Sequence, residues 1–348
     1  MNQPFVSGSI ETPNGKTPVV ESILRFRDRL GFVKVRCGIG RMNYRVDPGL
    51  YALGSPDADS PVFVSANFKM SFDRLREALP GKNAWILVLD TDGINVWCAA
   101  GKGTFGDAEL TGRIGASGLA DVVRHRNVII PQLGAPGISA HEVRRLSGFK
   151  AIYGPIRASD LPVFLESGMK ASPGMRIKTF SMGERLSLVP VEMIHAFKTL
   201  LLILPVIFVL SGFSGAGGFV SNALRLGALS AFGLVIAVLA GCLLTPALLP
   251  WLPGRAFSLK GVWPGIACAL FFLMLSNTWS APAAAGVLWS IAWMLIIPAV
   301  SAYLAMNFTG CSTFTSLSGV KKEMRTAVPV QISVLALGIV FWVISLFT

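Results

Sequence analysis

The chain of 348 residues is 52% hydrophobic and 14% charged, with a formal net charge of +12 at pH 7. This composition excludes an ordinary soluble protein, in which about a quarter of the residues carry a charge. Basic residues beside an anionic membrane leaflet account for much of the positive charge, so it does not indicate nucleic-acid binding. Apolar residues gather beyond about Val189, which predicts a soluble domain at residues 1–190 and a membrane domain at residues 191–348.

The soluble domain is expected to contain a core over about residues 61–170, with a helix, a strand pair and a loop from residues 20–60 packed beside it. Strand-like runs in the core lie at residues 61–68, 84–93 and 127–137, helical patterns lie at residues 71–79, 106–123 and 139–149, and a short strand and helix follow at residues 151–168. Ser71 is an expected helix cap, and Ser139 and Glu142 predict a capping box. This alternation predicts a mostly parallel, Rossmann-like sheet.

Three loops are expected at the carboxyl edge of this sheet, where such sheets bind ligands: SANFK from Ser65, DTDGINVWCAAGKGT from Asp90 and LGAPG from Leu133. In the second loop, Asn95 is a suitable N-cap and Gly101 a suitable C-cap for about one helical turn. Cys98 lies in the middle of that turn, and the alanines after it would let a large flat ligand approach the backbone. A free cysteine is also commonly a small buried hydrophobe, and the residues alone leave both interpretations open.

Two common cofactor classes find no support in the motifs. GKGTFG, from Gly101, satisfies G-x-G-x-x-G but lies well beyond the strand that such a loop must follow directly, so nucleotide binding is not favoured. The five cysteines show no C-x-x-C and no four-cysteine pattern, so no disulfide framework and no iron–sulfur centre are expected.

The membrane domain contains five long apolar runs, at residues 193–213, 227–249, 262–276, 284–306 and 328–347. Most of them reach the roughly 20 residues that span a bilayer, so five transmembrane helices are expected. The third run is short and contains a proline, and we expect it to need part of residues 256–260 to cross. The Gly/Ser/Thr-rich stretch from Asn307 to Met324 is expected to be a flexible cytoplasmic loop before the fifth helix.

The charges of the connecting loops predict the orientation of the chain. The second and fourth loops are basic, with Arg255, Lys260, Lys321, Lys322 and Arg325, whereas the first and third offer only Arg225. Basic loops face the cytoplasm, which places the soluble domain in the cytoplasm and, with five crossings, the C-terminus outside it. The chain is therefore expected to be a multi-pass protein of the cell inner membrane.

Several stretches together resemble a known family. The segment NVWCAAGKGTFG, with PQLGAPGISAHEV and the five-helix tail, resembles the mercury-methylating corrinoid membrane proteins of bacteria and archaea. GRMNYRVDPGLYALG, SANFKMSFDRLR and NFTGCSTFTSLSGV extend the resemblance over nearly the whole chain. The soluble domain is also similar to the corrinoid domain of the corrinoid iron–sulfur protein of acetyl-CoA synthesis, whose four-cysteine cluster motif is missing here.

The resemblance implies a corrinoid-binding α/β domain followed by an all-α membrane domain. It implies that Cys98 is the catalytic residue and the lower axial ligand of the corrinoid cobalt. The implied cofactor contacts of the cap segment are Asn95, Val96, Trp97, Cys98, Ala99, Ala100, Gly101, Lys102, Gly103 and Thr104. The topology adds Ser65, Asn67, Gly134, Ala135 and Gly137 from the neighbouring edge loops. The D-x-H-x-x-G motif of histidine-ligated corrinoid proteins is absent, and His125, His141 and His195 lack its context.

The resemblance also implies an activity: a corrinoid-dependent methyltransferase that moves a methyl group from methyl-cobalt(III) to Hg(II), forming methylmercury. The implied partners are a small ferredoxin with two [4Fe–4S] clusters, which would return cobalt to cobalt(I), and a methyl donor of the methyl-tetrahydrofolate pathway. Cys311 is a conceivable thiol for receiving the mercury. Two alternatives remain open, a corrinoid methyl carrier in one-carbon and acetyl-CoA metabolism and a non-catalytic membrane protein that binds a corrinoid.

Overall fold

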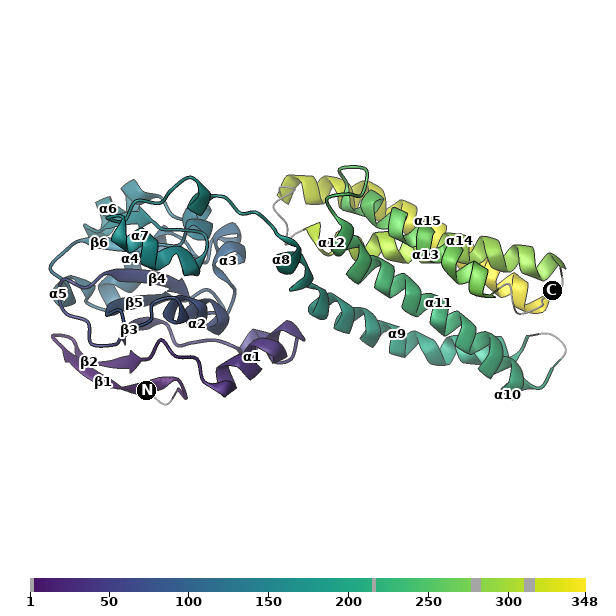
Figure 1. Ribbon diagram of the computed structural model, residues 1–348, viewed down its shortest axis with the longest axis horizontal. Helices are drawn as coiled ribbons and strands as arrows, with labels where there is room; N and C mark the ends of the chain where they lie inside the picture. Colours follow the sequence, from purple (N-terminus) through teal and green to yellow (C-terminus); the bar gives the residue numbers. More distant parts are fainter. Residues whose placement is uncertain (1–2, 215–216, 277–282, 310–316) are drawn as a thin grey trace. The chain divides into compact units, whose positions relative to one another are not determined.

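The computed structural model describes residues 3–214, 217–276, 283–309 and 317–348 (Figure 1). The chain divides into two compact units, Met1–Lys178 and Thr179–Thr348. The first is an α/β unit and the second is entirely helical in its described part. Cys311 and the rest of residues 310–316, within the expected loop from Asn307, lie outside the described residues.

A mixed sheet of seven strands runs through the described residues of the first unit, in the order β1-β2-β3-β5-β4-β6-β7. The strands are β1 (Val6–Thr12), β2 (Gly15–Val20), β3 (Gly49–Leu53), β4 (Val62–Ala66), β5 (Ala84–Leu89), β6 (Asn127–Ile130) and β7 (Lys150–Tyr153). β4 to β7 pair in parallel, as predicted for the core. The β2–β3 pair is also parallel, whereas the β1–β2 hairpin and the β3–β5 pair are antiparallel, so the sheet is mixed but mostly parallel, with four parallel pairs out of six.

Helices cover both faces of the sheet, and each core strand is followed by at least one helix. They are α2 (Lys69–Glu77) after β4, then α3 (Val96–Lys102), α4 (Asp107–Ala116) and α5 (Leu119–Val122) after β5, α6 (Ala140–Ser147) after β6 and α7 (Leu161–Glu166) after β7. The chain leaves β4 for β5 on one side and returns to β6 on the other. Such a reversal of strand order opens a crevice at the carboxyl ends of the two central strands, here β4 and β6.

The central strands form because every position is apolar or small and buried. Along β4, Val62, Val64 and Ala66 enter one apolar cluster while Phe63 enters the other, and β5 alternates in the same way. α3 to α6 cover the first cluster, and α2 and α7 cover the second. Strands buried on both faces appear as continuous apolar runs, which is why the sequence marks them clearly.

Residues 20–60 contain the expected helix, α1 (Phe26–Arg36), a 3-10 turn η1 (Arg41–Asn43) and a single strand, β3, instead of a strand pair. Two predicted caps are also wrong. α2 begins at Lys69, two residues before Ser71. The backbone N–H of Ser139 donates to Asp107, at 2.7 Å, and not to Glu142, because Glu142 instead pairs with Arg145. In the second case Asp107, from α4, takes the place that the predicted capping box gave to Glu142.

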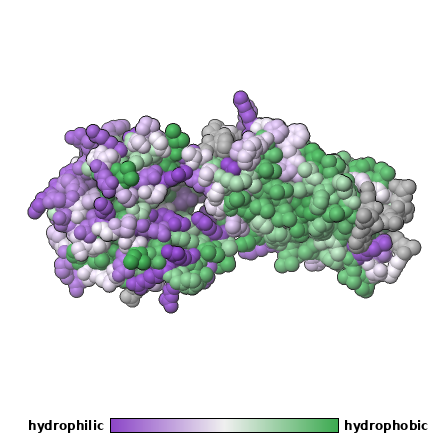
Figure 2. Space-filling model, viewed as in Figure 1, coloured by the Kyte–Doolittle hydropathy of each residue, from purple (hydrophilic) through white to green (hydrophobic). Residues whose placement is uncertain are grey.

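The second unit contains the predicted five helices long and apolar enough to cross a membrane, counted in the described residues. They are Met182–Gly212, Phe219–Leu248, Phe257–Ser276, Ala285–Met306 and Gly319–Phe347. The third starts at Phe257 and therefore includes part of residues 256–260, as expected. The fifth belongs to α15 (Leu317–Phe347), so residues 317–324, predicted as loop, are helical. Figure 2 shows that apolar residues dominate the face of this unit seen in that view.

The helices of the second unit are α8 (Met182–Leu186), α9 (Val189–Gly212), α10 (Phe219–Asn222), α11 (Ala228–Leu239), α12 (Thr245–Leu248), α13 (Phe257–Ser276), α14 (Ala283–Met306) and α15, with π-turns at Ala223–Gly227 and Ala240–Leu244. Small residues let these helices approach closely. A Cβ at Gly265 would lie 2.6 Å from Pro298 Cα, and one at Gly261 would lie 2.6 Å from Ala305 Cβ. The α13–α14 contact therefore depends on glycine, as in many membrane helix pairs.

Candidate functional site

The predicted cap segment forms a short helix, α3, at the carboxyl edge of the sheet. Asn95 is its N-cap, as predicted, and the Asn95 Oδ1 atom accepts a hydrogen bond from the Cys98 N–H at 2.9 Å. The helix continues past Gly101 and ends at Gly103, whose φ of +85° lies in the left-handed region. The sequence offers two glycines at this end, and the one that adopts the left-handed conformation terminates the helix.

One side of α3 is buried and the other is open. Val96, Ala99 and Ala100 are buried in the apolar cluster beneath the helix. Cys98, Gly101, Lys102 and Gly103 are exposed, and Trp97 and Thr104 are half-buried. Because the Cys98 thiol is exposed, the interpretation of this residue as a small buried hydrophobe is wrong.

The side chain of Asn67 holds the loop that carries α3 through hydrogen bonds. Its side-chain Oδ1 accepts hydrogen bonds from the backbone N–H of Thr91 at 3.1 Å, the Thr91 hydroxyl at 2.8 Å and the N–H of Gly93 at 2.9 Å. Its Nδ2 donates to Asp90 Oδ1 at 3.0 Å. With 1% of its surface exposed, Asn67 connects the end of β4 to the loop after β5. It acts on the site by holding this loop.

The third edge loop supports α3 from the side. It forms the turn η2 (Gln132–Gly137), which packs on α3. A Cβ at Gly134 would lie 2.5 Å from the ring of Phe105, and one at Gly137 would collide with the Phe105 carbonyl and lie 3.2 Å from Ala100 Cα. Both glycines permit close packing behind the cap helix. Ala135, between them, is half-buried.

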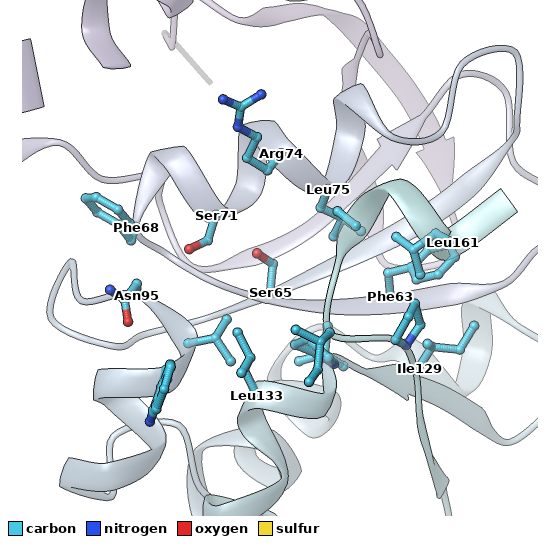
Figure 3. Close-up of a pocket in the computed structure, with 18 of the residues that line it drawn as sticks. Phe63, Ser65, Phe68, Ser71, Arg74, Leu75, Asn95, Ile129, Leu133 and Leu161 are labelled. Atoms are coloured by element: carbon cyan, nitrogen blue, oxygen red, sulfur yellow. The ribbon is translucent and has the colours of Figure 1, made fainter. Parts of the chain in front are cut away.

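A cavity of about 380 Å³ opens at the crevice between the ends of β4 and β6, beside α2 and α3 (Figure 3). Most of its walls are apolar. The polar residues that line it are Ser65 from β4, Ser71 and Arg74 from α2 and Asn95 from the cap loop. Figure 3 shows the hydroxyl groups of Ser65 and Ser71 directed toward the same space.

The structure brings part of the predicted site to this cavity. Ser65, Asn95, Val96 and Trp97 line it, whereas Cys98 lies exposed on α3 outside the lining, and Asn67 and the η2 glycines lie behind the cap helix. The contribution of α2, through Phe68, Met70, Ser71 and Arg74, was not predicted. The position of this helix directly after β4, at the crevice, was the signal that could have found it.

No group of three or more histidine, cysteine, aspartate or glutamate side chains in the described residues is placed to hold a metal ion. His125 shares a 2.9 Å hydrogen bond with the Ser60 carbonyl, and His141 shares one of 2.8 Å with the Ser139 hydroxyl. Neither histidine lines the cavity.

Comparison with known proteins places the similarity in this unit. The sequence model of a family described as CO dehydrogenase/acetyl-CoA synthase delta subunit matches residues 39–165. The acetyl-CoA decarbonylase/synthase complex subunit gamma of Methanopyrus kandleri is 33% identical over 123 residues, 35% of this chain and 26% of the relative. The gamma subunit of Archaeoglobus fulgidus is 31% identical over 128 residues, 36% of this chain and 27% of the relative. The chain thus spans about a quarter of the length of these relatives.

These matches correct the predicted family and activity. They name subunits of an acetyl-CoA decarbonylase/synthase complex, and they contradict a mercury methyltransferase, Hg(II) as its substrate and a dedicated ferredoxin as its partner. Two of the motifs behind those predictions, the cap segment and PQLGAPG, lie inside the matched residues 39–165, whereas the five-helix tail and NFTGCSTFTSLSGV lie outside them. The cap segment and PQLGAPG mark the shared α/β unit, and a shared unit does not specify what becomes of a transferred group.

The predicted corrinoid cofactor, in contrast, agrees with these matches and is confirmed by them. The similarity also favours the first of the two alternatives, a role in one-carbon and acetyl-CoA metabolism.

Proposed function

We propose that this protein binds a corrinoid at the carboxyl edge of β4 and β6 and carries methyl groups for one-carbon and acetyl-CoA metabolism. The proposal rests on the overlap between the residues that match the relatives and the residues that form the candidate site. The residues similar to the acetyl-CoA decarbonylase/synthase subunits, 39–165, contain the cap helix α3, the turn η2 and the whole cavity. A ligand-binding edge and the family similarity therefore fall on the same part of the chain.

The residues at this edge fit a corrinoid. A corrinoid would bring its cobalt already held by the macrocycle, and the exposed Cys98 thiol could add a ligand from the protein. The surface beside it is low and open, because a Cβ added at Gly101 or Gly103 would meet nothing within 4 Å. A broad flat group can lie over this surface, and the adjacent cavity of about 380 Å³ can receive one of its side groups.

A bound corrinoid supplies a cobalt centre that accepts and releases a methyl group, and the chain positions it. Cys98 would hold the metal as a soft thiolate donor. Asn95 fixes the first turn of α3 through the Cys98 N–H, and Asn67 fixes the loop before it. Gly134 and Gly137 keep η2 close behind the helix, so the thiol stands on a rigid support.

We further propose that the five apolar helices hold this unit at the cytoplasmic face of the cell inner membrane, with proteins that donate and accept the methyl group as its partners. Arg255, between the second and third spans, and the basic residues at the starts of the third and fifth spans support this orientation: Lys260, Lys321, Lys322 and Arg325. Reporter fusions test it: a fusion before Met1 is expected to behave as cytoplasmic and a fusion after Thr348 as extracytoplasmic. Both ends on one side would contradict five crossings.

The central test uses the full chain in lipid nanodiscs, loaded with a corrinoid that carries a ¹⁴C-methyl group on cobalt. We expect about one corrinoid per chain to survive gel filtration, and the label to pass to added cobalt(I) corrinoid at a rate well above that of the free cofactor. Failure to retain the corrinoid would refute the proposal. Retention without transfer would favour the remaining alternative, a membrane protein that binds a corrinoid without catalysis.

A further inference from the structure

An apolar stripe lies open on α1. Phe26, Leu30 and Val33 are 78%, 41% and 58% exposed, and their spacing places them on one face of the helix. The buried face, with Phe32 and Val35, lies on the opposite side. Ile23, before the helix, and Ile39 and Met42, after it, are also exposed, at 73%, 60% and 65%. These six residues are called the α1 stripe below.

Positive charge flanks the α1 stripe on both sides. At about 100° per residue, Arg27 and Lys34 lie along one flank, and Arg29 and Arg36 along the other. In the part of the chain that the structure describes, none of these four forms an ion pair with a carboxylate. An exposed apolar face between rows of free cations is the pattern of helices that lie in the interface of an anionic membrane.

The helix is held so that the α1 stripe faces outward. Asp28, on its buried side, accepts hydrogen bonds from Lys69 Nζ at 2.6 Å and from Arg76 Nη2 at 2.9 Å. Asp73 bonds the same two cations, at 2.6 and 2.8 Å, and Arg76 also donates to the Glu21 and Ile23 carbonyls. Burial raises the pKa of Asp28, but Lys69, the Arg25 amide and Arg76 outweigh it and hold this pKa below its ordinary value. The network of Asp28, Lys69, Asp73 and Arg76 therefore fixes α1 to α2.

We propose that α1 is an interfacial membrane helix, whose α1 stripe enters the headgroup region of an anionic bilayer while its flanking cations contact lipid phosphates. The charge of the flanks complements anionic lipid, and each basic residue near such a surface adds to the attraction. The five apolar helices of the same chain keep a bilayer within reach, so the helix needs only weak intrinsic affinity to dock.

The test places a photo-reactive benzoyl-phenylalanine at position 26 of the full chain, in nanodiscs of phosphatidylcholine with or without phosphatidylglycerol. The exposed position tolerates the larger side chain. We expect lipid adducts by mass spectrometry, several-fold more abundant with phosphatidylglycerol, and a return to the lower yield in the R27E/K34E variant. A matched control carries the label at position 163, where Val163 is 56% exposed on α7, and should give few lipid adducts.

Three results would overturn the proposal. The first is no adduct in either lipid mixture, and the second is adducts only to protein, either to the second unit or to another copy of the chain. The third is an equal yield of lipid adducts with and without phosphatidylglycerol. The measurement uses no corrinoid, so its outcome is independent of the proposed function.

Discussion

The same residue types behave in opposite ways in the two units of this chain. In the first unit, Leu87 and Leu89 of β5 are completely buried between covering helices. In the second, Leu201 and Leu202 of α9 are 68% and 79% exposed, on a helix long and apolar enough to cross a membrane. An exposed leucine in water is costly, whereas in lipid it is solvated by the acyl chains. The first unit therefore buries these leucine side chains in the core that supports the site. The second unit exposes leucine side chains, as the proposed membrane anchor requires.

The family similarity falls on the same side of this division, since the matched residues 39–165 belong entirely to the first unit. We therefore assign the ligand chemistry to the first unit and the location to the second. Changes in one unit should leave the property of the other intact, and the following predictions test this separation.

The largest effect is expected from Cys98→Ala. It removes the proposed cobalt ligand but little volume, on an exposed helical position that tolerates alanine. Methyl transfer from the loaded protein should fall by at least about a hundredfold, and the optical spectrum of the bound corrinoid should shift as sulfur ligation is lost. Membrane insertion should not change. Cys98→His should retain some corrinoid, because imidazole also binds cobalt.

Cys37→Ala is the matched control, because Cys37 is a half-buried cysteine of the same unit outside the cavity lining. Its spectrum and transfer rate should equal those of the wild type. If Cys98→Ala also keeps both, Cys98 does not bind the cobalt and the proposed site is wrong.

The next largest effect concerns the stability of the first unit. Arg76→Met leaves Asp28 and Asp73 buried with Lys69 alone, and breaking a buried charge network of this kind costs about 3–5 kcal/mol. Arg74→Met is the control on the same helix, since Arg74 pairs with Glu77 at the surface and should cost at most about 1 kcal/mol. Hydrogen exchange of β4 and β5 in increasing urea measures the free energy of unfolding. Equal costs for the two variants would show that the network is not stabilising.

A smaller effect is expected in the second unit. Gly265→Val forces a side chain against Pro298 and should cost about 1–3 kcal/mol, seen as a lower melting temperature in detergent. Gly286→Val, where a Cβ meets nothing within 4 Å, is the control. The corrinoid spectrum should be that of the wild type in both variants. A changed spectrum in Gly265→Val alone would mean that the two units are coupled and that the assignment of separate roles is incomplete.

An effect of similar size is expected to separate two glycines of the site, Gly137 and Gly101. Gly137→Ala places a methyl group against the Phe105 carbonyl, so we expect it to displace α3 and to destabilise the unit by about 1–3 kcal/mol. Gly101→Ala meets open space within the helix and should stabilise it by up to about 1 kcal/mol. Thermal unfolding of the two variants, compared with wild type, checks the difference. A Gly137→Ala variant as stable as Gly101→Ala would show that η2 does not support the cap helix.

The sequence predicted the features that depend on local pattern. The apolar runs of β4 and β5, the Asn95 cap and the five long helices follow from periodicity, capping and length. The β1–β2 hairpin was missed because apolar residues are a minority in its strands and only two of their positions are buried.

Features that depend on distant partners could not be predicted. The role of Asn67 arises from bonds to residues 90–93, which only the pairing of β4 with β5 brings near. The lining contributed by α2 has the same origin. The activity was predicted wrongly because motifs of a shared domain describe how a ligand is held, while its reaction depends on partners outside that domain.

One helix, α2, belongs to both surfaces described here. Lys69 and Arg76 on it hold α1, and Ser71 and Arg74 on it line the cavity. If occupation of the cavity and docking of α1 favour different positions of this helix, the two equilibria are thermodynamically linked. If a ligand in the cavity raises the affinity of α1 for the membrane by some factor, then docking of α1 raises the affinity of the cavity for that ligand by the same factor. The lipid surface would then act as an effector of the site, and the affinity measured in detergent would differ from that measured in a bilayer.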